Sequence, residues 1–231
     1  MSLPSPSERP RYVQALFTRI ARRYDLMNRL MTGYQDQRWR SEVIRRARLH
    51  AGDLLLDLGA GTGDLAYEAL RQQPQARVVA ADFTLEMMRV GRHNRSGPHW
   101  SAADALHLPF PNSTFDAAVS GFLIRNVSDP LRCLREQHRV LKPGGRIVIL
   151  DTTRPRSHLL SPLIRLHMHF IIPLLGWLLT GDPDAYHYLS HSTETFFTAE
   201  HLAVLLAFAG FQRIGFRRTM FGTVAIHWAE K

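Results

Sequence analysis

The chain has 231 residues, 45% of them hydrophobic and 21% charged, a size and composition that fit one soluble globular domain. Its single cysteine, Cys133, excludes an intramolecular disulfide, and its longest apolar stretch, residues 170–179, is shorter than the roughly 20 residues of a transmembrane helix. The net charge of +9, carried almost entirely by arginine, favours an anionic partner such as nucleic acid or a membrane surface, unless it reflects a general preference for arginine.

The N-terminal segment, residues 1–10, is polar and rich in proline, lacks the apolar core of a signal peptide, and is predicted to be a disordered tail. A helical region is expected next, over about residues 11–50, packed on the core of a single domain that spans residues 11–231. The observation behind it is a set of apolar residues at helical spacing: Val13, Leu16, Phe17 and Ile20.

Short apolar strands then alternate with helices. Pro74 ends one helix, Asp129 with Pro130 opens another in the favoured cap-then-proline order, and Thr198 caps a third. The run Lys-Pro-Gly-Gly at residues 142–145 is predicted to separate a helix from the strand after it. Because strands alternate with helices, we expect a parallel, doubly wound sheet. The strands are predicted at Leu54–Leu58, Ala76–Ala81, His99–Ala102, Phe115–Ser120 and Arg146–Leu150.

Two segments depart from this alternation. Residues 152–192 carry several prolines and aromatic residues on an apolar face, and are predicted to form an inserted helical lid. Phe211–Arg218 and Thr223–Trp228, joined by a tight turn, are predicted to form an antiparallel hairpin. The predicted fold class is therefore α/β: a doubly wound, Rossmann-like, mostly parallel seven-stranded sheet with a C-terminal antiparallel hairpin and a helical lid insertion.

A glycine-rich turn follows the first predicted strand, with Gly59, Gly61 and Gly63 in a G-x-G-x-G pattern. The dinucleotide fingerprint, G-x-G-x-x-G, needs its third glycine for close helix packing, and Asp64 occupies that place here. S-adenosylmethionine has no phosphate to cradle, but its amino-acid group must pass close to the backbone, which glycine permits. The turn therefore predicts S-adenosylmethionine as the cofactor and a class I methyltransferase fold.

Three carboxylates lie at successive strand ends. Asp57, just before the turn, can meet the ammonium of the cofactor directly or through water. Asp82 ends the second strand, where a carboxylate accepts from both ribose hydroxyls, and Asp104 follows the third, where it can accept from the adenine amino group. Each alone would be an ordinary exposed acid at a strand end, but all three beside a glycine turn favour a cofactor site.

Motifs along the whole chain match a known family: Tyr24-Asp25-Leu26-Met27-Asn28, the glycine turn from Asp57 to Asp64, Leu108-Pro109-Phe110, Arg125-Asn126-Val127, Arg139–Gly145 and Thr223–His227. In this order, over residues 12–229, the chain resembles the C-methyltransferase family of menaquinone and ubiquinone biosynthesis. The glycine turn and Leu-Lys-Pro-Gly-Gly occur in many methyltransferases, whereas Tyr-Asp-Leu-Met-Asn and Arg-Asn-Val are far more specific. The family usually has a glutamate after the fifth strand, where this chain has Asp151-Thr152-Thr153.

The resemblance implies a prenylated hydroquinone as methyl acceptor, foremost demethylmenaquinol, with a ubiquinone precursor as the alternative. It also implies cofactor contacts at matching motif positions, including Thr62, Ala105 and Ser120. No metal site is predicted. The complete set of predicted cofactor-binding residues is Tyr24, Asp57, Gly59, Ala60, Gly61, Thr62, Asp82, Phe83, Met87, Asp104, Ala105 and Ser120.

Methyl transfer from a sulfonium is an in-line displacement, for which positioning and desolvation supply most of the catalysis. A hydroquinol ring carbon is a weak nucleophile until a neighbouring hydroxyl loses its proton. Arg125 and Asn126, after the fourth strand, are the predicted catalytic pair. Because arginine is effectively always protonated, Arg125 is expected to lower the pKa of the phenol, while Asn126 orients a water that carries the proton away. Alternatively, Arg125 pairs with a nearby carboxylate.

Other functions would use parts of the same pattern. A nucleic-acid amino-methyltransferase typically needs an Asp/Asn-Pro-Pro-aromatic element after the fourth strand, where residues 120–125 contain no proline. A cytosine C5 enzyme needs a cysteine nucleophile, but Cys133 lies inside a predicted helix. Nucleic acid is therefore not an expected partner. Another small phenolic or polyketide acceptor, and a non-enzymatic protein that binds the nucleoside, remain alternatives.

The isoprenoid tail of a prenylated substrate lies in the bilayer, so the lid is expected to reach it there. Residues 170–179, with Trp177, either form an apolar tunnel, contact the membrane interface, or pack as core. The expected location is the cytoplasm, with peripheral contact at the inner face of the membrane, and the sequence leaves a homodimer open.

Overall fold

The structure is a computed structural model that describes residues 8–92, 97–154, 170 and 196–231. Nearly all of the predicted lid, and residues 1–7 of the predicted tail, lie outside the described residues. In chain order the elements are α1 (Arg9–Ile20), η1 (Ala21–Arg23), α2 (Tyr24–Thr32), α3 (Gln35–Ala47), β1 (Leu54–Leu58), α4 (Asp64–Gln72), β2 (Arg77–Asp82), α5 (Leu85–Arg92), β3 (His99–Ala102), β4 (Phe115–Gly121), η2 (Ile124–Asn126), α6 (Pro130–Val140), β5 (Leu141–Thr152), α10 (Ala199–Phe208), β6 (Gln212–Thr219), η4 (Met220–Gly222) and β7 (Val224–Glu230).

Among the described residues, seven strands form one sheet in the order β3-β2-β1-β4-β5-β7-β6. The first five run parallel, and β7 pairs antiparallel with both β5 and β6. This arrangement confirms the predicted doubly wound sheet with its antiparallel C-terminal hairpin. The strand order reverses between β1 and β4, the topological switch point at which open α/β sheets bind ligands beyond the carboxyl ends of their strands.

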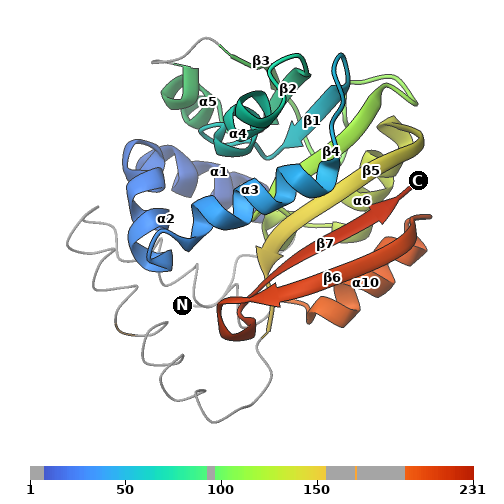
Figure 1. The fold of residues 1–231 in the computed structure, drawn as a ribbon. Coiled ribbons are helices and arrows are strands. Elements are labelled where there is room, and N and C mark those ends of the chain that lie inside the picture. The colour runs from blue at the N-terminus through green and yellow to red at the C-terminus, as the bar shows by residue number, and fades with distance from the viewer. Residues whose placement is uncertain (1–7, 93–96, 155–169, 171–195) are drawn as a thin grey trace.

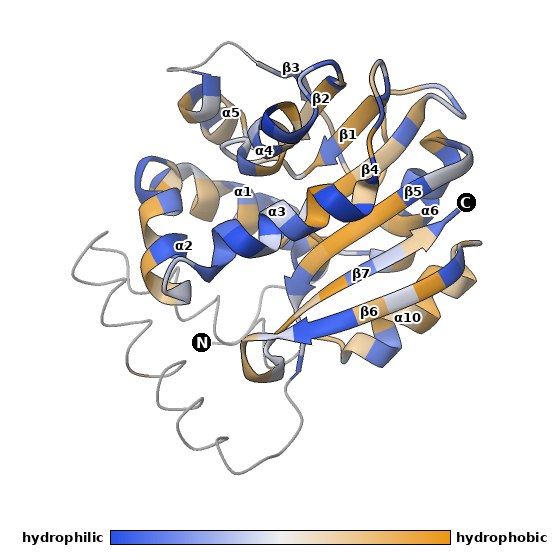
Figure 2. Ribbon diagram, in the orientation of Figure 1, coloured by the Kyte–Doolittle hydropathy of each residue, from blue (hydrophilic) through white to orange (hydrophobic). Residues whose placement is uncertain are grey.

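Hydrophobic side chains alternate between the two faces of the central strands, as a pleated strand buried on both faces requires. On β5, Ile147 and Ile149 join one core cluster while Val148 and Leu150 join the other. Helices α3 and α4 cover one face of the sheet and α6 and α10 cover the other (Figure 1). Figure 2 shows the hydrophobic residues along the central strands. Cys133 of α6 is 0% exposed within this core.

The N-terminal helices form a cluster of their own, in which Leu16 and Ile20 of α1 pack against Met27 and Met31 of α2. With α3, they occupy the region between Arg9 and Ala47, where helices were predicted. Helix α1 begins at Arg9, so the last two residues of the predicted disordered tail are helical instead. The reason is Pro10, because proline fits the first turn of a helix, where its missing N–H leaves no hydrogen bond unmade.

Strand β5 begins earlier than predicted. It includes residues 142–145, the Lys-Pro-Gly-Gly run that was expected to separate helix from strand. The pairing with β4 shifts across this run, from Phe115 opposite Leu141 to Ala117 opposite Arg146. The run is therefore an irregularity inside a strand, where glycine's freedom lets the chain bulge and then resume its pairing. The predicted caps hold, since Asp129 accepts from the Arg132 N–H and Thr198 from the His201 N–H.

Candidate functional site

The glycine turn between β1 and α4 is built on left-handed backbone. Gly59, Gly61 and Gly63 have φ values of 68°, 59° and 87°, which other residues adopt only with strain. Space is short as well, because a Cβ on Gly59 would lie 2.8 Å from Cδ1 of Leu123. The turn is tied to the neighbouring strand, since the N–H groups of Gly59 and Ala60 donate to the carbonyl of Ala81 at 2.8 and 3.1 Å.

Asp57, the second-last residue of β1 before the turn, is 1% exposed. Its Oδ2 accepts from the N–H of Ala66, in the first turn of α4, at 3.0 Å. Its Oδ1 is buried and has no hydrogen-bond partner among the described residues. Burial raises the pKa of Asp57 to about 7, although the Ala66 N–H opposes the shift. An unpaired carboxylate oxygen in such a place suits a cationic ligand, because a buried polar group is costly without a partner.

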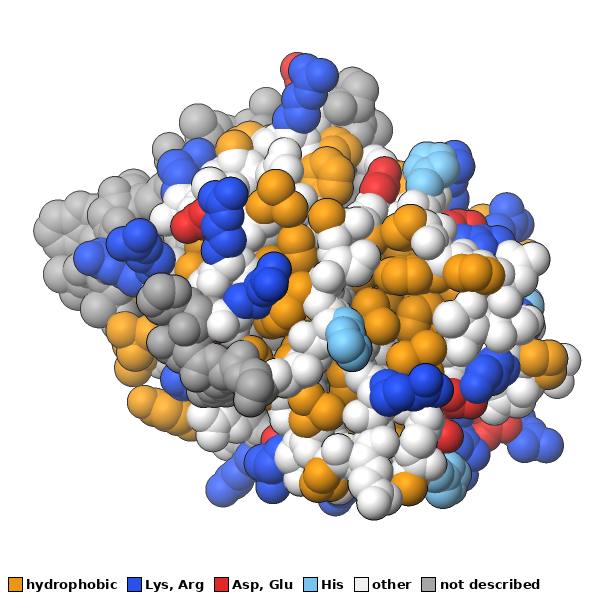
Figure 3. Space-filling view, turned by 90° about the horizontal axis from the view of Figure 1, so that it is seen from above, with side chains coloured by type: hydrophobic (Ala, Val, Ile, Leu, Met, Phe, Trp, Pro, Cys, Tyr) orange, Lys and Arg blue, Asp and Glu red, His pale blue; other side chains and the backbone are white. Residues whose placement is uncertain are grey.

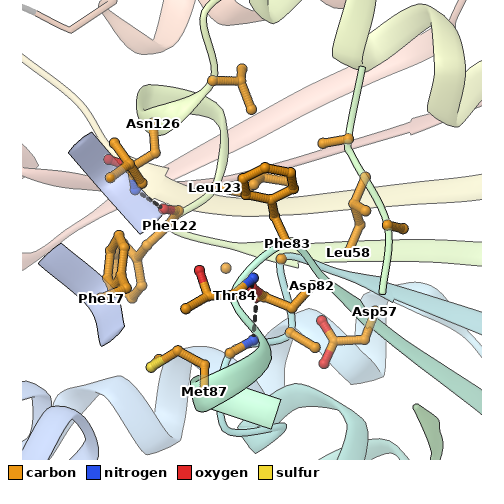
Figure 4. A pocket seen from close by; sticks show the side chains of 18 of the residues that line it. Phe17, Asp57, Leu58, Asp82, Phe83, Thr84, Met87, Phe122, Leu123 and Asn126 are labelled. Carbon is orange, nitrogen blue, oxygen red and sulfur yellow. Dashed lines mark hydrogen bonds between the residues drawn. The ribbon is translucent and has the colours of Figure 1, made fainter. Parts of the chain in front are cut away.

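Asp82 ends β2, and backbone groups fix both of its carboxylate oxygens. Oδ2 accepts from the N–H of Gly61 and Oδ1 from the N–H of Thr84, each at 2.7 Å (Figure 4). Burial raises the pKa of Asp82, and these backbone hydrogen bonds partly offset the rise. Because its orientation is fixed before any ligand arrives, the carboxylate is suited to accept hydrogen bonds from a pair of hydroxyls.

Asp104 and Ala105 follow β3. The Oδ1 of Asp104 accepts from the N–H of Leu106 at 2.9 Å, and its side chain is half exposed. Ala105 is buried at 8% exposure. The loop that carries both residues stands at the carboxyl end of the sheet beside β2, as the sequence predicts.

One cavity at this end of the sheet gathers eleven of the twelve predicted cofactor residues. They lie with Phe17, Phe122 and Leu123 around the space seen in Figure 4. The exception is Ser120, which does not line the cavity. It lies in β4 at 0% exposure, and its Oγ is buried without a hydrogen-bond partner among the described residues. The eleven that line it are Tyr24, Asp57, Gly59, Ala60, Gly61, Thr62, Asp82, Phe83, Met87, Asp104 and Ala105.

The N-terminal helices close one side of this cavity, where the sequence analysis had placed Tyr24 as their only residue. Gln14 of α1 donates from its side chain to the carbonyl of Phe83 at 3.2 Å, and Asp25 of α2 accepts from the hydroxyl of Thr62 at 2.6 Å. Arg40 of α3 also lines the cavity. Helical spacing identified the helices, but it gave no sign of which loop they would contact. The Tyr-Asp-Leu-Met-Asn motif, which contains Asp25, was the only hint.

The predicted catalytic pair is divided between the cavity and the core. Asn126 lines the cavity, and its side-chain nitrogen donates to the carbonyl of Phe122 at 2.9 Å. Arg125 does not line it. Its guanidinium lies 3.0 Å from Asp151 of β5, in an ion pair whose side chains are 5% and 1% exposed. This pairing is the alternative considered from the sequence, and Asp151 belongs to the stretch in which the family was expected to have a glutamate.

The backbone of Arg125 is held by the same carboxylate. Its N–H donates to Oδ2 of Asp151 at 3.2 Å, and the N–H of Thr152 donates to Oδ1 at 2.8 Å. Burial raises the pKa of Asp151, and the Arg125 charge opposes that rise. The short helix η2, with Asn126 at its end, is therefore fixed on the end of β5 by a buried ion pair.

The sheet order, the glycine turn and the acids at three successive strand ends define an S-adenosylmethionine-dependent methyltransferase of the class I type. The orphaned Oδ1 of Asp57 and the crowded glycines fit the ammonium and the backbone-hugging amino-acid part of that cofactor. The model of the ubiE/COQ5 methyltransferase family matches residues 6–231, and the chain belongs to this family. It is an S-adenosylmethionine-dependent C-methyltransferase.

Relatives cover nearly the whole chain. A protein of Desulfotalea psychrophila named ubiquinone/menaquinone biosynthesis C-methyltransferase UbiE is 44% identical over 95% of this chain and 90% of its own length. A demethylmenaquinone methyltransferase of Thermus thermophilus is 39% identical over 94% of this chain and 100% of its own.

Solved structures support the fold. A methyltransferase of Thermotoga maritima, described as a possible histamine N-methyltransferase, has a TM-score of 0.66 at 18% identity and covers 94% of this chain and 98% of its own. The [4+2]-cyclase SpnF has a TM-score of 0.63 at 22% identity, covering 84% of this chain and 80% of its own. Because one of these is named a cyclase, the shared fold by itself does not fix the reaction.

Proposed function

We propose that this enzyme methylates a ring carbon of a prenylated hydroquinone, and that the acceptor is demethylmenaquinol. The observation that carries the proposal is the set of relatives named demethylmenaquinone methyltransferase, 34–39% identical over 94% or more of this chain. The cavity supports it, because an apolar wall adjoins the predicted cofactor residues and suits a flat ring with an isoprenoid tail. That wall consists of Val13, Phe17, Phe122, Leu123 and Val127.

The chemistry needs one bond broken, one bond formed and one proton removed. The bound cofactor supplies an electrophilic methyl group on its sulfonium. The acceptor ring carbon takes this methyl and loses its own hydrogen as a proton, and the sulfonium becomes a neutral thioether. Because a neutral hydroquinol is a poor carbon nucleophile, the residues around the ring must favour its phenolate form.

Within this proposal Arg125 acts by its charge and by its position. Tyr24 is a phenol in the same cavity, and burial raises its pKa, while the Arg125 charge is one of the effects that oppose this rise. A substrate phenol in that place would feel the same two opposing effects. Arg125 is protonated and paired with Asp151, so it is not the proton acceptor. Asn126 lines the cavity and is the residue that orients a water to remove the proton.

The test is methyl transfer from labelled S-adenosylmethionine to purified acceptors. We expect turnover with demethylmenaquinol and none with transfer RNA or duplex DNA. A second acceptor, the ring precursor of ubiquinone that awaits C-methylation, belongs in the same assay because the Desulfotalea psychrophila relative is named for both pathways. Turnover of free small phenols at rates equal to those of the prenylated quinol would contradict the proposed acceptor.

A nucleic-acid substrate lacks support from the described surface and from the cysteine. Basic side chains are spread among apolar ones on the face shown in Figure 3, without a continuous basic stripe on that face. Cys133, the single cysteine, is fully buried in α6, and burial raises the pKa of its thiol to about 12. A thiol held neutral in the core cannot attack a cytosine ring.

We also propose that the enzyme meets its substrate at the surface of a membrane. Within the described residues, none of the helices is both long and apolar enough to cross a bilayer. The net charge of +9 would attract an anionic leaflet, and the isoprenoid tail must be drawn from it. Flotation with anionic liposomes tests this proposal: Trp177→Ser with Leu178→Ser should reduce the bound fraction, and equal flotation of both proteins would refute a role for this segment.

A further inference from the structure

Arg40 is the one basic side chain among the described residues that line the cofactor cavity. It extends from α3, at the end of the cavity formed by the glycine turn, and its side chain is 10% exposed. Four aspartates line the same cavity: Asp57, Asp64, Asp82 and Asp104. The charge of the Arg40 guanidinium is therefore set among four acidic side chains in the lining of this cavity.

The guanidinium of Arg40 is held on two sides. Its Nε lies 3.2 Å from Oδ2 of Asp64, at the start of α4, and one terminal nitrogen lies 2.9 Å from Oδ2 of Asp36. Asp36 is 1% exposed and also contacts the hydroxyl of Thr32 at 3.2 Å. The other terminal nitrogen of Arg40 has no hydrogen bond to any of the described residues. A guanidinium has five donors in a rigid fork, so an anion in the cavity could still be bound.

The cofactor carries such an anion. Its amino-acid end has an ammonium and a carboxylate on the same carbon, so both must be accommodated within a few ångströms. Asp57, with its unpaired Oδ1, suits the ammonium. Arg40 and Asp57 line the same cavity, and the positive charge of Arg40 opposes the rise in the pKa of Asp57 that burial causes. Without Arg40, a carboxylate in this cavity would meet only like charges.

We propose that Arg40 binds the amino-acid carboxylate of S-adenosylmethionine, with Asp36 and Asp64 holding its guanidinium in place. This assignment rests on the cofactor site described above. The competing interpretation is that Arg40 only joins α3 to α4 through its two ion pairs. The two interpretations differ in the ligands they affect. Loss of a contact to the carboxylate weakens only ligands that carry this group, whereas loss of the connection between α3 and α4 distorts the cavity and weakens every ligand that binds in it.

The experiment measures the affinity of three nucleosides by calorimetry: S-adenosylhomocysteine, its decarboxylated analogue, and 5′-methylthioadenosine, which lacks the whole amino-acid group. In the wild type we expect the decarboxylated analogue to bind roughly 10- to 100-fold more weakly than S-adenosylhomocysteine, the range of a charge-assisted hydrogen bond. Equal binding of these two ligands would overturn the assignment without any variant. Failure of all three to bind would instead refute the cofactor site.

Variants then locate the effect. Arg40→Met should weaken S-adenosylhomocysteine by a similar roughly 10- to 100-fold, while the decarboxylated analogue binds as well as before or better and methylthioadenosine is unchanged. The matched control is Arg45→Met on the same helix, which removes an exposed ion pair with Glu42 and should change none of the three affinities. An equal loss for all three ligands in Arg40→Met would show a structural role and overturn the assignment.

A milder substitution keeps the assignment testable if Arg40→Met fails to fold. Arg40→Lys keeps the charge but loses the fork, so we expect a smaller loss that is again confined to S-adenosylhomocysteine. If Arg40→Lys weakens methylthioadenosine and S-adenosylhomocysteine by the same factor, Arg40 does not bind the carboxylate.

Discussion

At the scale of single residues, burial governs the charge of the carboxylate beside the glycine turn. Asp57 has a pKa raised to about 7, chiefly because burial disfavours its ionised form. The protonated form of Asp57 is therefore more favoured in the folded protein than in the unfolded chain. The corresponding contribution to stability is present at low pH and is lost as the pH rises from the ordinary range of an aspartate, near 4, to about 7. A bound ammonium would reverse this preference.

We expect the affinity for S-adenosylhomocysteine to rise between pH 6 and pH 7.5, as Asp57 ionises and gains a charge for the ammonium. The affinity for methylthioadenosine, which has no ammonium, should stay constant over the same range. Calorimetry at several pH values measures both. In Asp57→Asn the pH dependence should vanish and the affinity should stay low; a pH dependence that survives this substitution would assign it to another group.

The ion pair between Arg125 and Asp151 sets a second expectation. Arg125→Ala leaves Asp151 buried without its cation, a change that typically costs about 3 to 5 kcal/mol of stability. Methyl transfer should fall steeply, while S-adenosylhomocysteine affinity, measured on the folded fraction, stays within a few-fold. Chemical denaturation and single-turnover assays provide the two readouts.

The double variant Arg125→Met with Asp151→Leu separates structure from catalysis. It removes both buried charges, so much of the stability should return while methyl transfer stays low. Recovery of activity together with stability would show that the charge of Arg125 has no part in the reaction.

At the scale of elements, Gly91 allows helix α5 to pack closely against the turn between β1 and α4. A Cβ on Gly91 would lie 2.5 Å from the carbonyl oxygen of Thr62 and 2.6 Å from the ring of Trp100. Tyr67 also donates from its hydroxyl to the carbonyl of Gly91 at 2.8 Å. The turn that must accommodate the cofactor is thus supported from behind by a helix with no space for a side chain.

Gly91→Ala should consequently lower the free energy of unfolding by about 1 to 3 kcal/mol, the usual cost of overpacking, and weaken cofactor binding by displacing Thr62. Thermal denaturation with and without S-adenosylhomocysteine measures both effects. Arg92→Ala, on the exposed side of the same helix, is the control and should change stability by less than about 0.5 kcal/mol. Unchanged stability in Gly91→Ala would mean that α5 can shift freely.

The order of elements could be predicted from the sequence because strand and helix periodicities, caps and glycine turns are local. The bulge at residues 142–145 could not be predicted, because Pro and Gly are unfavourable inside a strand and only the pairing with β4 shows that this strand continues through them. The three strand-end acids were found because a parallel sheet brings its carboxyl ends together. Arg40 was missed, since its place in the cavity depends on how α3 packs, which no local pattern records.

At the scale of the whole molecule, helices α1 and α2 share an apolar cluster of their own, yet they help to complete the cofactor cavity. The polar contact from the side chain of Gln14 in α1 to the carbonyl of Phe83 is exposed to solvent. These helices are expected to open more readily than the sheet. Cofactor binding should therefore be coupled to their closure.

Hydrogen exchange of the full chain tests this coupling. Amides of α1, Arg9–Ile20, should gain protection when S-adenosylhomocysteine is bound, because the ligand contacts the closed cavity. Amides of β5 in the centre of the sheet should exchange only through global unfolding and serve as the internal reference. Equal protection changes in both elements would mean that the ligand stabilises the whole domain uniformly and that α1 does not open by itself.

The burial of Cys133 makes the rate of thiol labelling a measure of how often the core opens. Cys133 lies on α6, its side chain is fully buried, and it is the single cysteine of the chain. A thiol reagent can react only while the core around Cys133 is open. The rate at which the unmodified protein is labelled therefore reports the frequency of this opening. We expect labelling over hours in the native state, within seconds in denaturant, and more slowly still when S-adenosylhomocysteine is present.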